Sequence, residues 1–314
     1  MQIAVIYSKP SRKIRATAYG ATDEDSAIIA DKVVMGVESL GHKARLIEIN
    51  EDHIEEIGSI RADVIFNLIE WCGSDIHLAK IAFGYLRRLK IPVTGSAEAE
   101  FVLTGDKIAL KNFLLKNHIP TPGKTKFPMI VKPSLEHCSM GLGYDSIAQN
   151  TRELEEIIKK KEGEFGQPML YEEFIVGREL LVYLIVIEGV IKVLPIEELL
   201  FSNGNPLAFQ TYAAKWEIDH PDYKTSRVEV ANLTDSERQI IEKVSIDAFE
   251  KLGLRGYARF DVRFADNIPY FLECNANPSV YDGEDDEINP ESEVIPGIKF
   301  CDYLEAIVLA ARIL

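Results

Sequence analysis

The residues whose types and spacing are best suited to chemistry lie between residues 255 and 280. Two short runs there have the apolar and polar alternation of strands. Their polar positions are Arg259, Asp261, Arg263, Glu273 and Asn275. Alternate residues of a strand share one face, so a hairpin of the two runs would bring together two carboxylates, an amide and at least one guanidinium.

Such a cluster would be costly inside a protein without a cation to balance it. Oxygen ligands of this kind suit Mg²⁺, which proteins usually hold through one or two carboxylates while substrate phosphates fill other positions. The segment therefore predicts a nucleotide and metal site. The alternative is an internally paired Arg, Asp and Glu network on an ordinary hairpin that turns at Asp266 and Asn267.

Length and composition are those of a globular protein with several subdomains. The chain has 314 residues, of which 46% are hydrophobic and 27% charged. Single cores stop growing near roughly 250–300 residues, which favours two or three units. The net charge of −15 argues against a nucleic-acid partner. We expect no membrane segment and no signal peptide, and the four cysteines have no zinc-ligand spacing, so they are expected to be free thiols in a cytoplasmic protein.

The first hundred residues alternate between apolar strands and amphipathic helices. Strands are expected at residues 2–8, 44–49, 64–68 and 92–94, with helices at 23–40 and 76–89 and a weak helix after Asn50. This order predicts a parallel sheet with helices on both faces. The loop after the first strand lacks the GxGxxG pattern of dinucleotide sites. The domain is therefore expected to be a Rossmann-like platform without a phosphate loop.

The remaining chain changes character at a turn-rich joint at residues 118–123. Before the joint, one helix is expected at residues 97–117, with Lys107 inside it. After the joint, a strand at residues 127–132 ends in Lys132, and a loop rich in serine and glycine follows. Small residues let backbone N–H groups approach phosphate oxygens closely, but a flexible hairpin tip would look the same.

The following segments predict an antiparallel half. Strands are expected at residues 168–175, 180–187 and 190–194, and a loop-rich stretch with Lys215 at 201–221. A capped helix is expected at 234–252 and an apolar-faced closing helix at 300–314. The sequence therefore changes from a parallel to an antiparallel arrangement near its middle.

In their order along the chain, these features resemble the ATP-grasp superfamily, and within it the D-alanine–D-alanine ligase-like branch. The order is Lys107, Lys132, a Ser/Gly loop, EEFI, GRE, Lys215, RxD and ExN. The resemblance covers nearly the whole chain. It implies an α/β (α+β) protein with the ATP-grasp fold: a Rossmann-like domain at residues 1–96, a small central lid at 97–170, and an antiparallel catalytic subdomain at 171–314.

The resemblance also implies a role for individual residues. Lys107, Lys132, Ser139 and Gly141 would contact ATP phosphates. Glu172, Glu173, Phe174 and Ile175 would form the strand that meets adenine, and Glu179 would bind the ribose. Asp261, Glu273 and Asn275 would hold Mg²⁺, with Mn²⁺ as an alternative. The catalytic set would be Arg259 at the oxyanion, Lys215 near the transferred phosphoryl group, and Ser139.

The implied reaction has two steps. A substrate carboxylate takes the γ-phosphate of ATP to give an acylphosphate and ADP, and an amine then attacks the activated carbonyl and expels phosphate. Such an enzyme has to activate the acid, exclude water and align the amine. The Ser/Gly loop and residues 212–216 are candidates for the lid that excludes water. The partners would be small-molecule acids and amines, and the resemblance is compatible with a homodimer.

Several segments depart from the ligase pattern. Residues 7–13 (YSKPSRK) stand in place of a GxS-type start with a glutamate and a serine, residues 70–75 (EWCGSD) replace a His-Gly and Gly-Glu-Asp loop, and Cys138 replaces the first serine of the phosphate loop. After Asn275, a threonine-rich turn is replaced by NPSVYDGEDDE. We expect a different substrate, with a cationic amine facing the acidic residues 282–287, although such a charge run is often just a solvated surface. The alternatives are an authentic D-alanine–D-alanine ligase with divergent loops, or an ATP-binding regulatory protein that has lost catalysis.

Overall fold

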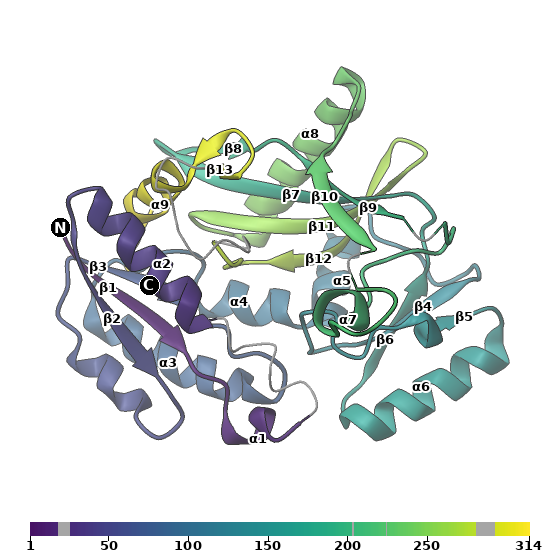
Figure 1. The fold of residues 1–314 in the computed structure, drawn as a ribbon, viewed down its shortest axis with the longest axis horizontal. Coiled ribbons are helices and arrows are strands. Elements are labelled where there is room, and N and C mark those ends of the chain that lie inside the picture. The colour runs from purple at the N-terminus through teal and green to yellow at the C-terminus, as the bar shows by residue number, and fades with distance from the viewer. Residues whose placement is uncertain (18–25, 203, 224, 281–292) are drawn as a thin grey trace.

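The amino-terminal part of the chain forms a parallel sheet. The computed structural model describes residues 1–17, 26–202, 204–223, 225–280 and 293–314. The sheet has the strand order β2 (Lys43–Ile49), β1 (Gln2–Ser8), β3 (Val64–Leu68), and its pairs are parallel (Figure 1). The prediction of a parallel sheet is therefore confirmed.

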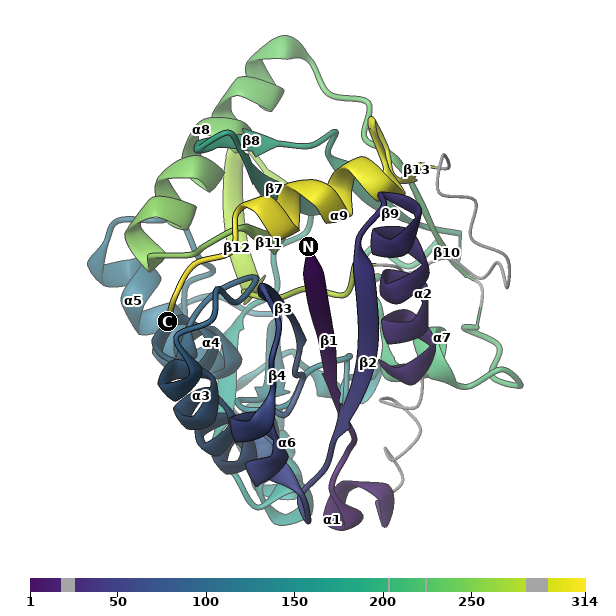
Figure 2. The same ribbon diagram turned by 90° about the vertical axis from the view of Figure 1, so that its left-hand side faces the viewer.

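Helices cover both faces of this sheet, as the nearly continuous apolar residues of β1 and β3 require. One face packs with α2 (Ser26–Ser39) and α9 (Phe300–Leu309), and the other packs with α3 (Ile76–Leu89) and the 3-10 helix η2 (Ile54–Ser59). Figure 2 shows α2 and α3 on opposite sides of the strands. Two short helices, α1 (Arg12–Arg15) and η3 (Gly73–Asp75), lie in loops that follow β1 and β3.

A larger antiparallel sheet forms the carboxyl-terminal part. Its order is β10 (Ser226–Val230), β9 (Glu197–Phe201), β7 (Arg178–Ile187), β11 (Tyr257–Ala265), β12 (Ile268–Asn275), and β8 (Val190–Val193) also pairs with β7. Helix α8 (Asp235–Leu252) begins at the predicted capping box, where Thr234 and Glu237 bond reciprocally. The strands β13 (Glu293–Ile295) and β14 (Ile298–Lys299) form a separate pair before α9.

A small antiparallel sheet lies beside the large one. Its order is β5 (Ile147–Ala148), β4 (Met129–Pro133), β6 (Met169–Glu173), and α6 (Thr151–Phe165) packs on it (Figure 1). The loop between β4 and β5 contains the 3-10 helix η4 (Tyr144–Ser146). The short helix α7 (Tyr212–Trp216), between β9 and β10, contacts this loop, so the two predicted lid segments are neighbours.

The helix predicted at residues 97–117 is wrong in one respect, because it is two helices. They are α4 (Glu98–Gly105) and α5 (Lys107–Lys116), and Asp106 separates them. The Asp106 carboxylate accepts hydrogen bonds from the backbone N–H groups of Ile108 and Ala109, so it caps the second helix. Lys107 is therefore the first residue of a helix and not an interior one.

Four other expectations need correction. The strand predicted at residues 92–94 is only a pair of isolated bridges at Val93, and the closing helix ends at Leu309. The strands β9 and β10 were not predicted, and α7 lies within the stretch expected to be a loop. Exposure explains the miss at β10, because four of its five residues are exposed and its sequence carries no buried apolar face.

The division at residues 96 and 170 stays a prediction. Strand β6 spans residue 170, and α4 and α5 contact β12 of the large sheet. In the described part of the chain, no helix has the length and apolarity needed to cross a membrane.

Candidate active site

The site is built on the hairpin of β11 and β12, which turns at Asp266 and Asn267 as predicted. Both turn residues have positive φ, 51° and 59°, a conformation that Asp and Asn tolerate better than most residues. Residues directly opposite in an antiparallel pair share a face. The register places Asp261 opposite Glu273. It also places Arg259 opposite Asn275, two residues away on each strand.

Each carboxylate of this hairpin is already paired with a cation. The guanidinium of Arg259 donates to both oxygens of Asp261, at 2.8 and 3.3 Å. Lys107 forms an ion pair with Glu273, and it also donates to the backbone carbonyl of Glu136. Burial would raise the pKa of Glu273, but Lys107, together with Lys132 and Arg259, lowers it. Glu273 is therefore held as an anion by the lysine at the start of α5.

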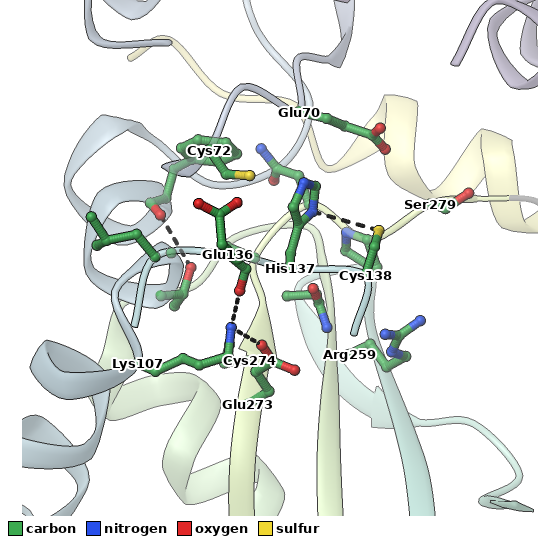
Figure 3. Close-up of a pocket in the computed structure, with 18 of the residues that line it drawn as sticks. Glu70, Cys72, Lys107, Glu136, His137, Cys138, Arg259, Glu273, Cys274 and Ser279 are labelled. Atoms are coloured by element: carbon green, nitrogen blue, oxygen red, sulfur yellow. Dashed lines mark hydrogen bonds and ion pairs between the residues drawn. The ribbon is translucent and has the colours of Figure 1, made fainter. Parts of the chain in front are cut away.

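Two pockets meet at this hairpin, and Glu273 lines both of them. Pocket A lies at the end of β12 and contains Lys107, Lys215, Arg259 and Asn275 (Figure 3). The rest of its lining comes from the loop after β3, from α4, from the loop after β4, and from the end of β12 with the loop that follows it. Those residues are Ile69, Glu70, Cys72, Phe101, Thr104, Gly105, Leu135, Glu136, His137, Cys138, Cys274, Ala276, Asn277, Pro278 and Ser279.

Pocket B lies between the small and large sheets. Its apolar walls are Ile130, Leu142, Phe174, Ile175, Phe209 and Leu272. Its polar lining consists of Lys132, Ser139, Glu172, Glu173, Glu179, Gln210, Asp261, Arg263 and Glu273. A cleft with both apolar walls and charged groups suits a ligand that has a flat ring and an anionic tail.

Glu172 lies at the base of pocket B between two lysines. Its carboxylate accepts from Lys132 at 2.9 Å and from Lys111 at 2.7 Å. All three side chains are buried, with exposed fractions of 1% for the glutamate and 8% and 4% for the two lysines. Burial would raise the pKa of Glu172, but the lysines lower it, so the acid is ionised. Each carboxylate oxygen of Glu172 thus pairs with a lysine, so only the main chain of this residue is left to contact a ligand.

The neighbouring acid, Glu173, caps a turn. One of its carboxylate oxygens accepts from the backbone N–H and hydroxyl of Thr125 and from the backbone N–H of Lys126. Burial would raise the pKa of Glu173, but these donors lower it. Its side chain therefore fixes the segment that leads into β4, at the edge of pocket B.

The sequence reasoning placed Arg263 on the correct face but gave it no role. In the structure, its guanidinium donates to Glu179 at 2.6 Å and to the backbone carbonyls of Gly177 and Ala208. It also lies over the ring of Phe174, 5.0 Å from the centroid. Burial raises the pKa of Glu179, and the guanidinium only partly opposes this effect. Alternation along β11 predicted the face on which Arg263 lies, but its partners are distant in the sequence and gave no local signal.

The loop between β4 and β5 is shared by the two pockets. Cys138 lines pocket A and Ser139 lines pocket B, and both have positive φ, 53° and 59°. At Gly141, φ is 71° and an added Cβ would lie 2.5 Å from the ring of Phe165, so this position requires glycine. The Ser/Gly loop is thus a tightly folded element between the pockets.

Helix α7 is fastened to the Ser/Gly loop. The indole of Trp216 donates to the carbonyl of Cys138 at 3.0 Å, and the backbone N–H of Tyr212 donates to the carbonyl of Leu142 at 2.8 Å. Lys215 lies over the Trp216 ring, 5.2 Å from its centroid, and lines pocket A. The two segments predicted to form a lid are therefore in contact with each other.

A histidine lies between two thiols in pocket A. The ring Nδ1 of His137 is 3.8 Å from the sulfur of Cys138, and Cys72 approaches the same ring from the loop after β3 (Figure 3). Burial would lower the pKa of His137, but the two thiols raise it well above its usual range. Burial would raise the pKa of Cys138, but His137 and Lys215 lower it despite Glu70. All four cysteines are free thiols, as predicted.

The donor set on the hairpin fits a magnesium ion. Asp261 and Glu273 offer carboxylate oxygens on one face, and Asn275 adds an amide whose buried Nδ2 has no hydrogen-bond partner. In the described residues, no three His, Cys, Asp or Glu side chains gather closely enough to hold a metal. The set therefore has two carboxylates and an amide, which is typical of Mg²⁺ sites completed by phosphates and water.

Comparison with known proteins identifies the chain. A family model described as "D-ala D-ala ligase C-terminus" matches residues 100–305. The chain belongs to this family. It is a C–N bond-forming ligase of the D-alanine–D-alanine ligase type, as the resemblance predicted.

Relatives and solved structures agree over nearly the full length. The D-alanine–D-alanine ligase of Thermotoga petrophila is 28% identical over 294 residues, which is 90% of each chain. The Bacillus anthracis D-alanine–D-alanine ligase has a similar structure, with a TM-score of 0.73 at 22% identity over 99% of this chain and 97% of that one. Its complex with ATP gives a TM-score of 0.70 at the same identity, over 99% of this chain and 96% of that one.

A ligase named for a different second substrate has the same fold. The VanG D-Ala:D-Ser ligase of Enterococcus faecalis has a TM-score of 0.70 at 17% identity over 98% of each chain. The predicted ATP-grasp architecture is confirmed by these structural similarities. They identify the fold and leave the second substrate open.

Proposed function

We propose that this ligase uses Mg-ATP to join the carboxylate of one amino acid to the amine of another, through an acylphosphate, with ADP and phosphate as products. The observation that supports this most directly is that Glu273 lines both pockets. A nucleotide in pocket B would extend its phosphates toward Glu273. An acid in pocket A would meet the terminal phosphate there.

The nucleotide would lie along pocket B. The main chain of residues 172–175 and the side chains of Phe174 and Ile175 would contact adenine, and Glu179 would accept from ribose hydroxyls. Lys132, Lys107 and the Ser139–Gly141 turn would contact the phosphates. Lysine charge and backbone N–H groups at positive φ are suitable phosphate donors, and Lys132 and Ser139 both line pocket B.

Asp261, Glu273 and Asn275 would hold the metal, with Mn²⁺ as an alternative to Mg²⁺. When bound, the ion neutralises charge on the phosphates during transfer. For the two carboxylates to bind the metal, Arg259 and Lys107 have to replace some of their contacts with Asp261 and Glu273 by contacts with substrate. Both cations line pocket A, where a carboxylate or acylphosphate would receive them.

The remaining residues would manage the reacting carbonyl. Arg259 lines pocket A and lies opposite Asn275 in the hairpin, and its guanidinium would stabilise the oxyanion that forms when the amine attacks. Lys215 of α7 also lines pocket A and would contact the transferred phosphoryl group. The contact of α7 with the Ser/Gly loop would exclude water, which would otherwise hydrolyse the acylphosphate.

D-Alanine is the first candidate for both substrates, because it is the substrate in the names of the relatives. A different amine is the second candidate. The specific observation for it is the segment at residues 70–75, which differs from the ligase pattern and brings Glu70 and Cys72 into pocket A. The acidic residues 282–287, proposed to face a cationic amine, lie outside the described residues.

An ADP-release assay over amino acids of both hands, offered singly and in pairs, tests the proposal when each product is identified by mass spectrometry. We expect ADP and phosphate only when a suitable acid and amine are both present. The product should have the summed mass of the two substrates less one water. A preference for D-alanine pairs would identify an authentic D-alanine–D-alanine ligase, and a preference for basic amines would identify the second candidate. Binding of ATP without turnover by any pair would contradict catalysis and favour a regulatory role.

A further inference from the structure

The ion pairs around pocket B are not balanced in the same way. Asp261 pairs with Arg259, Glu179 pairs with Arg263, and Glu273 pairs with Lys107, one acid with one base. Glu172 instead has two lysines, one on each oxygen. Among the described ion pairs of this pocket, the trio of Lys111, Glu172 and Lys132 therefore carries one positive charge in excess.

The geometry of the trio explains how it forms. Register across β4 and β6 places Ile130 opposite Glu172, so Lys132 lies diagonally across from the acid on the same face. Lys111 comes from α5, one helical turn after Lys107, and binds the Glu172 oxygen that Lys132 does not bind. Its ammonium group also donates to the carbonyl of Pro122 and to the hydroxyl of Thr121 at 3.3 Å. Lys111 thus joins α5, the joint before β4 and the base of pocket B.

Burial makes this charge balance important. A buried acid requires a partner, and a buried lysine is costly unless its charge is compensated. Burial lowers the pKa of Lys111 despite Glu172, whereas the acids around Lys132 raise the pKa of that lysine. Of the two lysines, only Lys132 lines pocket B. The excess charge of the trio is therefore presented to a ligand through Lys132.

We propose that Lys111 is a positioning residue for ATP: it holds one oxygen of Glu172, so that the acid does not neutralise Lys132 and the lysine remains available to the phosphates. This inference rests on the proposed binding of ATP in pocket B. Without Lys111, Glu172 and Lys132 would form a closed neutral pair. An anionic ligand would then have to compete with a buried carboxylate for the same ammonium group.

The test measures equilibrium binding of Mg-ATP to wild type and to variants of the trio by titration calorimetry. We expect K111M to weaken ATP binding about tenfold or more, as for a lost charge-assisted contact. The double variant K111M/E172Q removes an acid and a base together and leaves Lys132 charged. We expect it to bind ATP within about threefold of wild type, since one excess positive charge is restored. K116M, at an exposed lysine of the same helix, is the matched control and should bind as wild type does.

A purely structural role for Lys111 predicts a different outcome, because the double variant would then bind no better than K111M. That result, or wild-type affinity in a folded K111M, would overturn the inference. If K111M is too unstable to measure, E172Q replaces it. E172Q also releases Lys132 and should bind ATP at least as tightly as wild type, so weaker binding by folded E172Q would likewise overturn the inference. Failure of wild type to bind ATP would instead overturn the proposed function, and this inference with it.

Discussion

Asp261 lies directly opposite Glu273 in the hairpin of β11 and β12, and each carboxylate is paired with a different cation. Each cation compensates the charge of one acid at a point where the two acids lie side by side. We propose that both acids become available to a metal once substrate engages the cations. Several consequences can be measured.

Asp261→Asn should reduce ATP turnover by about a hundredfold or more, because it removes a charged metal ligand at the point where phosphoryl charge develops. ADP release measured over a range of Mg²⁺ concentrations would show the loss, together with a higher Mg²⁺ requirement. Asp266→Asn is the control, since this residue lies in the turn of the same hairpin, and it should leave turnover unchanged. Normal Mg²⁺ dependence in Asp261→Asn would contradict the assigned ligand set.

Trp216→Phe keeps an aromatic ring in α7 but removes the N–H that bonds the carbonyl of Cys138. A hydrogen bond contributes about 1 kcal/mol, so KM for ATP should rise by about fivefold, and more ADP should form without ligated product. The ratio of ADP to product measures this uncoupling. Trp71→Phe is the control, because its indole bonds the carbonyl of Lys9 outside both pockets. Equal uncoupling in the two variants would argue against a lid role for α7.

Cys138 should be the most reactive thiol at neutral pH. Its pKa is lowered by His137 and Lys215 against the effect of burial, so a larger fraction is thiolate at pH 7 than for an ordinary thiol. Burial raises the pKa of Cys274 well above its usual range, which makes that thiol an internal control. Alkylation rates from pH 5 to 9, mapped by mass spectrometry, should show early labelling of Cys138 and about tenfold slower labelling in His137→Gln. The opposite order of labelling would disprove the assigned environment.

Glu172 should contribute to stability in an acid-dependent way. Its folded pKa lies below the ordinary value of 4.5, so the contribution is complete above pH 4.5 and is lost as the pH falls through the folded pKa. Thermal midpoints from pH 3 to 7 should therefore fall more steeply for wild type than for K111M/E172Q, which lacks this acid. Parallel curves for the two proteins would contradict the buried ion pairs.

Local pattern was sufficient for much of the fold. The β1 and β3 strands, α3, the capped start of α8 and the hairpin turn were predicted, because apolar periodicity, capping and turn residues are local signals. The break at Asp106 was missed although its capping chemistry is visible, since apolar periodicity continues across it. The exposed strand β10 gave no such signal.

The site was predicted less completely, because its pairings are long-range. Sequence order indicated Lys107, Lys132, Asp261 and Glu273, but not that Lys107 pairs with Glu273 or that Lys111 shares Glu172 with Lys132. Those contacts join residues 40 to 166 positions apart, and only the folded chain brings them together. The roles of the site residues, a homodimer and a cytoplasmic location stay predictions.

Transfer of oxygen from the acid to phosphate tests the acylphosphate mechanism most directly. When the first substrate carries ¹⁸O in its carboxylate, the account predicts that the inorganic phosphate released with ADP contains one ¹⁸O atom for each bond formed. Mass spectrometry of the phosphate measures this. Unlabelled phosphate released together with ligated product, or AMP in place of ADP, would contradict the proposed reaction.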